Sequence, residues 1–273
     1  MLRSMYSGVS GMRGFQTKLD VIGNNIANVN TIGFKAGRVM FKDILSQSVA
    51  GVTAPEEGTQ GGTNAKQVGL GVSIAAIDTL HTAGSAMTTN VPTDVRIDGD
   101  GFFAVRASED QETPYLTRAG NFYLDAARQL VTSDGYFVLA EGGEPITLDE
   151  GVTSFSISQD GTIISIGADG TTEPTDFKIG VVKVTNPSGL EKVGGNMYRV
   201  TPNAILGGEV EVVAANSAEF GTGAIIAGQL EMSNVDLTNE FTEMIVAQRG
   251  FQANSRIITT SDEVLQEVVN LKR

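Results

Sequence analysis

The chain has 273 residues, and 41% of them are hydrophobic, which is enough for a packed core in one large domain or two smaller ones. The formal net charge of −13 disfavours nucleic-acid binding, and the absence of Cys excludes disulfides, thiolate catalysis and Cys-ligated zinc. The sequence has no apolar run of about eighteen residues and no continuous apolar stretch near its N-terminus, so it predicts neither membrane insertion nor a cleaved signal peptide.

The first predicted element is a helix over residues 3–28. Apolar residues recur there at a spacing of seven, which places them in one row on a helix. Gly8, Gly11, Gly14 and Gly23 each weaken such a helix by roughly 1 kcal/mol relative to Ala, so we expect it to need a packing partner. The residues that we expect to carry this packing are Met5, Met12, Leu19, Ile22 and Ile26.

A turn and a linker follow this helix. Asn28 and Gly33 tolerate left-handed backbone angles and indicate the helix stop. A short amphipathic piece is expected at residues 41–49, and a Gly- and Thr-rich linker at residues 46–71. The linker is too polar to form a core, so we expect it to be mobile in isolation and able to become ordered in a larger assembly. We take residues 1–45 as an N-terminal helical arm and residues 46–71 as the linker.

The hydrophobic period changes to two in residues 72–230, which predicts a central antiparallel β domain. Short β-favouring runs alternate with turn signals, as is typical of a sandwich or a barrel. The runs are 95–97, 102–105, 122–124, 136–139, 155–157, 162–166, 177–184 and 197–200, and the turns are 98–101, 134–135, 160–161, 169–170 and 186–189.

Residues 231–273 predict a C-terminal helical arm. A second row with a spacing of seven runs along it, and a sustained seven-residue repeat favours a left-handed coiled coil with a partner helix. The N-terminal helix can be that partner. The fold class is therefore α+β, with paired terminal helices and a central antiparallel all-β domain. The predicted packing residues are Leu237, Phe241, Met244, Phe251, Ile258, Leu265 and Val269.

The sequence offers no recognisable catalytic or cofactor site. His81 is the single histidine, and no G-x-S-x-G motif surrounds any Ser. The Asp98–Gly101 turn suggests a calcium loop, but Phe102 stands where an EF-hand needs an oxygen ligand, so hairpin turns explain these residues better. We therefore predict no enzyme activity, no cofactor and no metal.

The two ends resemble the bacterial flagellar axial proteins, a family of rod, hook and hook-associated subunits. LDVIGNNIAN at 19–28 and TIGFK at 31–35 are similar to the N-terminal signature of the family, and NVDL at 234–237 and MIVAQR at 244–249 to its C-terminal counterpart. IDGDGFF at 97–103 and TRAGNF at 117–122 resemble its first β domain. The motif residues singled out are Asn24, Asn25, Asn28, Gly33, Phe34, Gln248 and Arg249.

Within this family the residues of the two terminal motifs resemble those of the hook protein most, although the chain is short for a hook protein. The resemblance implies a homopolymeric tube around a central channel, with the paired helices inside and the β domain outside. It implies an extracellular hook, a bendable universal joint that passes motor torque to the filament, exported through the flagellar type III apparatus. Phe41–Leu45 resembles an export-recognition stretch, although an amphipathic turn explains it better.

The implied partners are other copies of the chain, rod proteins, hook–filament junction proteins, the hook cap and the export apparatus. A distal rod protein, a straight drive shaft of similar length, is the alternative from the same family. A soluble coiled-coil adaptor that forms a closed dimer is a remote alternative from another class, and a hydrolase that uses the acidic residues is more remote still.

Overall fold

The computed structural model describes residues 2–55, 61–108, 111, 113–149, 152–167, 171–208 and 210–271. It divides into two compact units. The helical unit comprises Met1–Ala27, Gly37–Thr79 and Asp236–Arg273, and the β unit comprises Asn28–Ala36 and Leu80–Val235. The chain therefore passes between the units at four points in the sequence.

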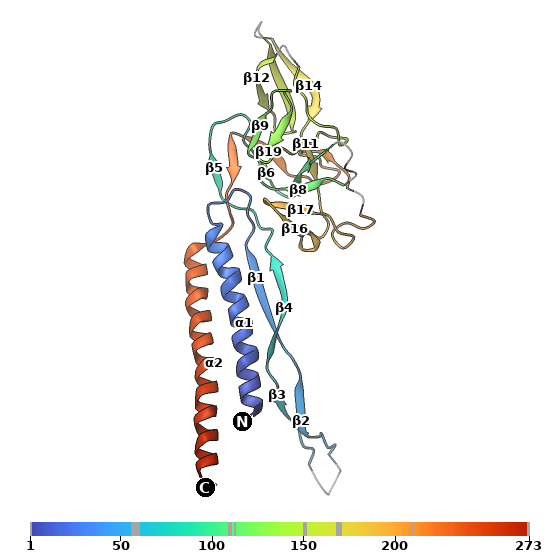
Figure 1. The fold of residues 1–273 in the computed structure, drawn as a ribbon. Coiled ribbons are helices and arrows are strands. Elements are labelled where there is room, and N and C mark those ends of the chain that lie inside the picture. Colours follow the sequence, from blue (N-terminus) through green and yellow to red (C-terminus); the bar gives the residue numbers. More distant parts are fainter. Residues whose placement is uncertain are drawn as a thin grey trace. The chain divides into compact units, whose positions relative to one another are not determined.

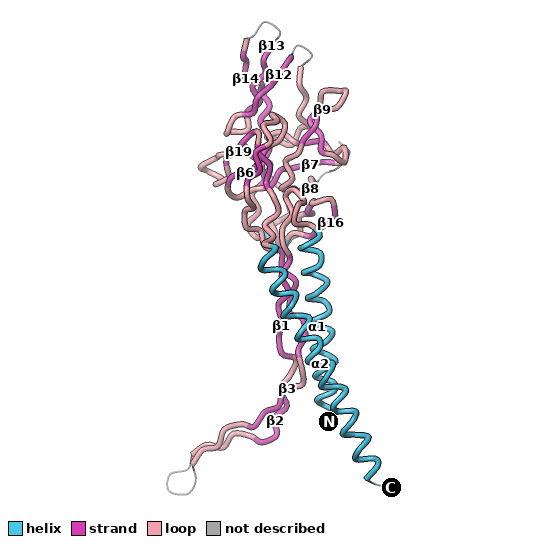
Figure 2. Tube along the Cα trace, turned by 90° about the vertical axis from the view of Figure 1, so that its left-hand side faces the viewer, coloured by secondary structure: helices cyan, strands magenta, loops and turns pink. Residues whose placement is uncertain are grey.

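Two long helices form the main body of the helical unit. Helix α1 spans Leu2–Ala27 and helix α2 spans Leu237–Leu271, and the two lie side by side (Figures 1 and 2). The Asp236 carboxylate accepts a hydrogen bond from the Thr238 amide at 2.9 Å and so caps the first turn of α2. The prediction of paired terminal helices with a central antiparallel β region is confirmed.

A long two-stranded ribbon completes the helical unit. Strand β1 (Gly37–Asp43) pairs antiparallel with β4 (Val72–Thr79), and β2 (Ser46–Ala50) pairs antiparallel with β3 (Lys66–Gly69) (Figure 2). These strands occupy the positions where the sequence suggested an amphipathic piece and a linker, and residues 56–60 of that linker lie outside the described residues. Every residue of β2 and β3 is exposed, so this pairing rests on backbone hydrogen bonds that composition does not reveal.

The β unit is built from antiparallel strands. Its main sheet has the order β16-β17-β8-β7-β11-β10-β9, with β15 joining β7 to β18, and beside it lie the sheet β12-β13-β14 and the pairs β19-β6 and β20-β5. The strand bounds are β5 Ala86–Thr88, β6 Val95–Asp98, β7 Phe102–Arg106, β8 Tyr115–Thr117, β9 Phe122–Leu124, β10 Leu130–Thr132, β11 Phe137–Val138, β12 Val152–Ile157, β13 Thr162–Gly167, β14 Thr172–Lys178, β15 Gly180–Val182, β16 Glu191–Gly194, β17 Met197–Arg199, β18 Val213–Ala214, β19 Ala224–Ala227 and β20 Gln229–Glu231.

Most of the predicted strands and turns coincide with observed ones. The expected run 177–184 is interrupted, because β14 ends at Lys178 and β15 begins at Gly180. Residues 187–189 form a short 3₁₀ helix, Pro187–Gly189. Gly135 and Gly161 have φ of 83° and 78°, the left-handed angles that the Asp-Gly turns require. The predicted turn at Asp169–Gly170 lies outside the described residues.

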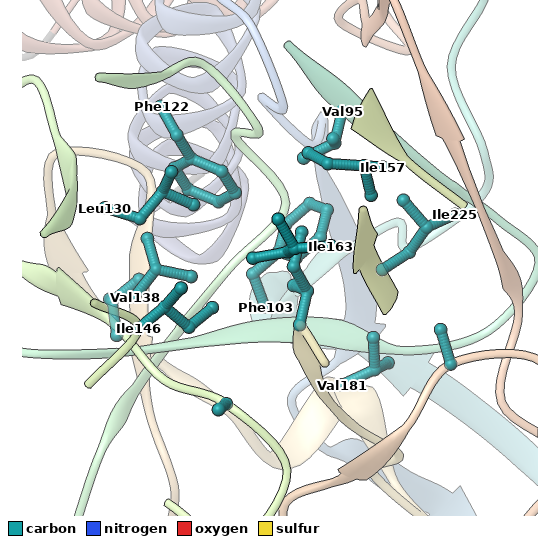
Figure 3. Packing of buried hydrophobic residues seen from close by; sticks show 14 of the residues in the cluster. Val95, Phe103, Phe122, Leu130, Val138, Ile146, Ile157, Ile163, Val181 and Ile225 are labelled. Atoms are coloured by element: carbon teal, nitrogen blue, oxygen red, sulfur yellow. The ribbon is translucent and has the colours of Figure 1, made fainter. Parts of the chain in front are cut away.

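The core of the β unit lies between its sheets. Phe103 and Phe122 meet edge to face with ring centroids 5.2 Å apart, and both are almost fully buried. Aliphatic side chains from β6, β10, β11, β13, β15 and β19 surround them (Figure 3). A second cluster forms around Phe102, Leu116 and Tyr198. Two well-filled clusters give the β unit a core of its own.

Candidate functional site

Small residues take part in the contact between α1 and α2. A Cβ at Gly11 would lie 2.8 Å from the Asn254 side chain, and a Cβ at Gly250 would lie 2.6 Å from the Phe15 ring. Ala247 has no exposed surface. Gly11, which the sequence indicated only as a weak point of the helix, and Gly250 therefore allow α1 and α2 to approach closely.

The predicted packing residues divide into two groups. Ile22 is buried, and Met5, Met12, Leu19, Ile26, Met244, Ile258 and Leu265 are half-buried. Phe241, Phe251 and Val269 are exposed by 50%, 37% and 65%, and Leu237 is also exposed. Further exposed apolar residues that the repeat did not single out as packing residues lie on α2, namely Ile245, Val246, Ile257, Val264, Val268 and Leu271. The apolar surface of α2 is thus wider than α1 covers, and the role of these residues in assembly stays a prediction.

The other face of α1 packs on the ribbon. The Phe15 and Phe41 rings lie 5.9 Å apart between centroids, and a Cβ at Gly14 would meet the Phe41 ring at 2.8 Å. The Ser10 hydroxyl accepts a hydrogen bond from the Val72 amide at 3.3 Å. Phe41, the first residue of the suggested export stretch, thus has a packing role in the helical unit, while Leu45 at the end of that stretch is exposed.

Asn25 joins three elements of the helical unit. It is buried, its amide nitrogen donates to the Gly37 carbonyl at 2.8 Å and to Glu240 at 3.0 Å, and its oxygen accepts from the Gly37 amide at 2.9 Å. Burial raises the pKa of Glu240, although the bond from Asn25 opposes that shift. Because its amide both donates and accepts, Asn25 fixes the end of α1 against β1 and α2.

The other motif residues either pack within the β unit or are exposed on the surface. Gly33 has φ of 68°, and a Cβ there would lie 2.6 Å from the Ala119 amide nitrogen. Phe34 is buried beneath the Lys192 ammonium, which lies 4.8 Å from the ring centroid. Gln248 and Arg249 are exposed on α2. The Asn28 side chain accepts a hydrogen bond from the Thr31 hydroxyl at 3.1 Å, and Asn24 is exposed.

A buried ionic cluster lies in the β unit. Glu231 and Lys35 are each 1% exposed, and the Lys35 ammonium donates to Glu231 Oε1 at 2.6 Å. Arg118 donates to Glu231 Oε2 at 3.3 Å, and the Gly84 amide donates to Oε1 at 2.9 Å. Arg118 also donates to the Gly99 carbonyl at 2.8 Å. Two cations thus share one carboxylate with little access to water.

The Asn234 side-chain amide forms hydrogen bonds with two segments of the chain near this ionic cluster. Its oxygen accepts from the Ala36 amide at 2.8 Å, and its nitrogen donates to the Leu80 carbonyl at 2.8 Å and to the Thr82 hydroxyl at 2.9 Å. We call Lys35, Arg118, Glu231 and Asn234 the base cluster, because three of them lie close in sequence to points where the chain enters or leaves the β unit.

The electrostatics of this region follow from burial and from the excess of cations. Burial alone would raise the pKa of Glu231, but Arg118 and Lys35 hold it below its usual value. His81 lines a cavity of about 980 Å³ with Phe102 and Arg118, and burial together with nearby Lys35 lowers its pKa to about 4. His81 is therefore neutral at pH 7, as expected for a histidine that packs against Phe102 and Tyr198.

Sequence reasoning overlooked the base cluster as a site. Lys35, Arg118 and Asn234 all fall inside the motifs quoted above, but nothing along the chain indicates that these motifs converge on one carboxylate. Glu231 lies outside every quoted motif. One signal in the sequence was that Lys35 follows the apolar Phe34. If Lys35 is buried with Phe34, its charge needs an acidic partner, because burying an unpaired charge is costly.

The described part of the chain contains no group of three or more His, Asp or Glu side chains that could hold a metal ion. Neither of its long helices is apolar enough to cross a bilayer. The described residues offer exposed apolar surfaces on α2 and a buried ionic cluster in the β unit.

Family models match three parts of the chain. The model described as "Flagellar hook protein FlgE/F/G D1 domain" matches residues 96–171, "Flagellar basal body rod FlgEFG protein C-terminal" matches residues 226–271, and "Flagella basal body rod protein" matches residues 5–35. The matched stretches contain Asn25, Arg118 and Glu231, so they include most of the polar residues described above.

Curated relatives align along the whole chain. The flagellar basal-body rod protein FlgG of Bacillus subtilis is 56% identical over 273 residues, with both chains fully covered. The FlgG of Borreliella burgdorferi is 38% identical over 276 residues, again with both chains fully covered. The flagellar hook protein FlgE of the same organism is 29% identical over an alignment of 451 positions that covers all of both chains.

Proposed function

The chain belongs to the flagellar rod and hook family FlgE/F/G, and we propose that within this family it is a distal rod subunit. The family is structural and non-enzymatic, and its members are axial proteins that polymerise with other rod and hook components. The observation that carries the rod assignment is the full-length match at 56% identity to a basal-body rod protein of matching length.

The assignment as a hook protein, which the motif residues favoured, is weaker than the assignment as a rod protein. The alignment to a hook protein spans 451 positions, far more than the 273 residues of this chain, so long insertions separate the two. The motifs at 19–28 and 244–249 occur in the shared helical ends, where rod and hook proteins are alike, and they do not distinguish the two. The length of this chain was the better signal, because it is short for a hook protein and equal to the length over which the rod protein aligns.

A rod subunit of this kind would form a straight tube that transmits torque through the cell envelope. Contacts between unlike surfaces of identical subunits do not close on themselves and produce an open helical polymer. Exposed apolar residues such as Phe241, Ile257 and Val264 on α2 are suited to contacts of this kind. Neighbouring rod and hook proteins would meet the two ends of the polymer, and the flagellar type III apparatus would export the chain.

The test is immunogold electron microscopy of detergent-extracted flagella with an antibody against the β unit. We expect gold on the straight segment below the hook. Gold on the curved segment between rod and filament would favour the hook. Absence of gold from the whole appendage, with the antibody shown to bind the purified chain, would contradict both assignments.

A further inference from the structure

We propose that the base cluster is a clasp that positions the two terminal helices for pairing. Glu231 is the central positioning residue of this clasp. The proposal concerns the single chain, so it holds whether the polymer is a rod or a hook.

The clasp connects segments that lie far apart in the sequence. The Gly33 amide donates to the Glu231 carbonyl at 2.8 Å, and the Asn234 amide donates to the Phe34 carbonyl at 3.4 Å. The Leu80 amide donates to the Ala36 carbonyl at 2.8 Å. Around Lys35, Glu231 and Asn234, segment 28–36 is thus fastened to segments 80–85 and 231–235.

These segments continue directly into the terminal helices. Helix α1 ends at Ala27, where segment 28–36 begins, and α2 begins at Leu237, just after segment 231–235 ends. With the clasp open and the β1–β4 and β5–β20 pairs kept, the shortest path between the two helix ends is about two dozen residues, whereas with the clasp closed it is about a dozen. The entropic cost of bringing two points together grows with the logarithm of that length, so closure raises the effective concentration of one helix for the other.

The helices need such assistance because their own contact is weak in isolation. Four glycines lower the stability of α1, and much of the apolar surface of α2 lies outside the pair. The buried Glu231 carboxylate needs at least one cation beside it, because a buried charge without a partner is costly. The cluster joins Lys35 from the N-terminal side to Glu231 and Asn234 from the C-terminal side.

The experiment measures intramolecular cross-linking between the helices. The chain has no native Cys, so Lys18→Cys and Glu243→Cys introduce the two thiols, at positions whose side chains form an ion pair between α1 and α2. A short bismaleimide is added to dilute monomer, and the rate of intramolecular cross-linking is compared with and without Glu231→Gln. We expect the rate to fall by roughly threefold.

The matched control is Glu191→Gln, which removes the carboxylate of the exposed Glu191–Arg199 ion pair in the same unit. It should leave the cross-linking rate unchanged. An unchanged rate in Glu231→Gln, or an equal fall in both variants, would overturn the proposal.

General unfolding of the β unit must be separated from opening of the clasp. Hydrogen exchange of the β7 and β13 amides reports on the core in the same samples. If Glu231→Gln loses that protection, Asn234→Ala takes its place, because it removes only the bonds to Ala36, Leu80 and Thr82. Slower cross-linking in Asn234→Ala with a protected core supports the clasp, whereas an unchanged rate contradicts it.

Discussion

At the residue scale, the base cluster shows how burial makes a charge dependent on its partners. Glu231 satisfies Lys35, Arg118 and the Gly84 amide at once, so its removal leaves two cations buried without a carboxylate. Removal of Lys35 is different, because Glu231 then keeps Arg118. Loss of Glu231 should therefore destabilise the β unit more than loss of Lys35.

This asymmetry gives a prediction for stability. Glu231→Gln should lower the free energy of unfolding of the β unit by about 3–5 kcal/mol, the range for breaking a buried ion pair. Lys35→Met should cost clearly less, since it leaves a single cation with a single carboxylate. Urea unfolding followed by near-ultraviolet circular dichroism measures both variants, and Glu191→Gln is the exposed control. Equal losses in the two cluster variants would show that the charge balance does not matter.

His81 gives a prediction for pH dependence. Its pKa is about 4 in the folded chain and about 6.5 when exposed, so the unfolded chain binds more protons between these values. The stability of the β unit should therefore fall by about 2 kcal/mol between pH 6.5 and pH 4.5. The depressed pKa of Glu231 acts mainly below its ordinary value of 4.5, so it contributes little in this window.

The matched variant is His81→Phe, which keeps a ring against Phe102 and Tyr198 but cannot be protonated. Unfolding curves at several pH values should show a flat response for this variant between pH 6.5 and pH 4.5. A slope equal to that of the wild type would assign the titration to another group.

At the element scale, sequence periodicity predicted the helices and most of the strands but not the small residues in the helix contact. A seven-residue apolar row draws attention to large side chains, whereas Gly11 and Gly250 have no room for a Cβ against the partner helix and Phe241 stays exposed. The row marks an apolar face without saying which part of it a partner covers. The β1–β4 and β2–β3 pairs were missed because such pairing depends on residues distant in sequence.

The same limit explains why the base cluster escaped prediction. Strand runs such as 122–124 and 162–166 are local patterns, and the structure has strands there. Lys35, Arg118 and Glu231 are brought together only by the fold of the β unit, and no local pattern carries that information. Asn25 and Gly33 were found through the family motifs, but the bonds and the backbone angle that require them appear only in the structure.

Two glycines give a matched prediction at this scale. Gly250→Ala places a Cβ 2.6 Å from the Phe15 ring, whereas Gly23→Ala meets no atom within 4 Å. Gly23→Ala should stabilise α1 by up to about 1 kcal/mol through helix propensity. Gly250→Ala should instead destabilise the helical unit by about 1–2 kcal/mol, because overpacking outweighs the same gain.

Thermal melts followed by circular dichroism at 222 nm compare the two variants. A shift of opposite sign is the expected result. Stabilisation by both substitutions would mean that Phe15 moves aside freely and that the close helix contact is not tight.

At the scale of the whole molecule, much apolar surface is left for other subunits. Phe241, Ile257, Val264 and Val268 are all exposed along α2. In the ribbon, Leu45, Val49 and Val68 are exposed as well. A monomer rarely keeps so much apolar surface in contact with water, so these residues indicate where a polymer would bury them.

This surface gives the last prediction. Phe241→Asp places a charge on α2 at a side chain that is 50% exposed, so the helix pair should persist while polymerisation fails. The control is Gln252→Asp, which adds the same carboxylate between Arg249 and Arg256 on the same helix. Sedimentation over a range of concentrations measures assembly, and circular dichroism at 222 nm verifies the helices. Because an open polymer grows with concentration, wild type and control should sediment faster as concentration rises and Phe241→Asp should not. Growth of Phe241→Asp equal to that of the control would remove Phe241 from the subunit contacts and leave Ile257, Val264 and Val268 on α2 and the apolar residues of the ribbon as the surfaces to test.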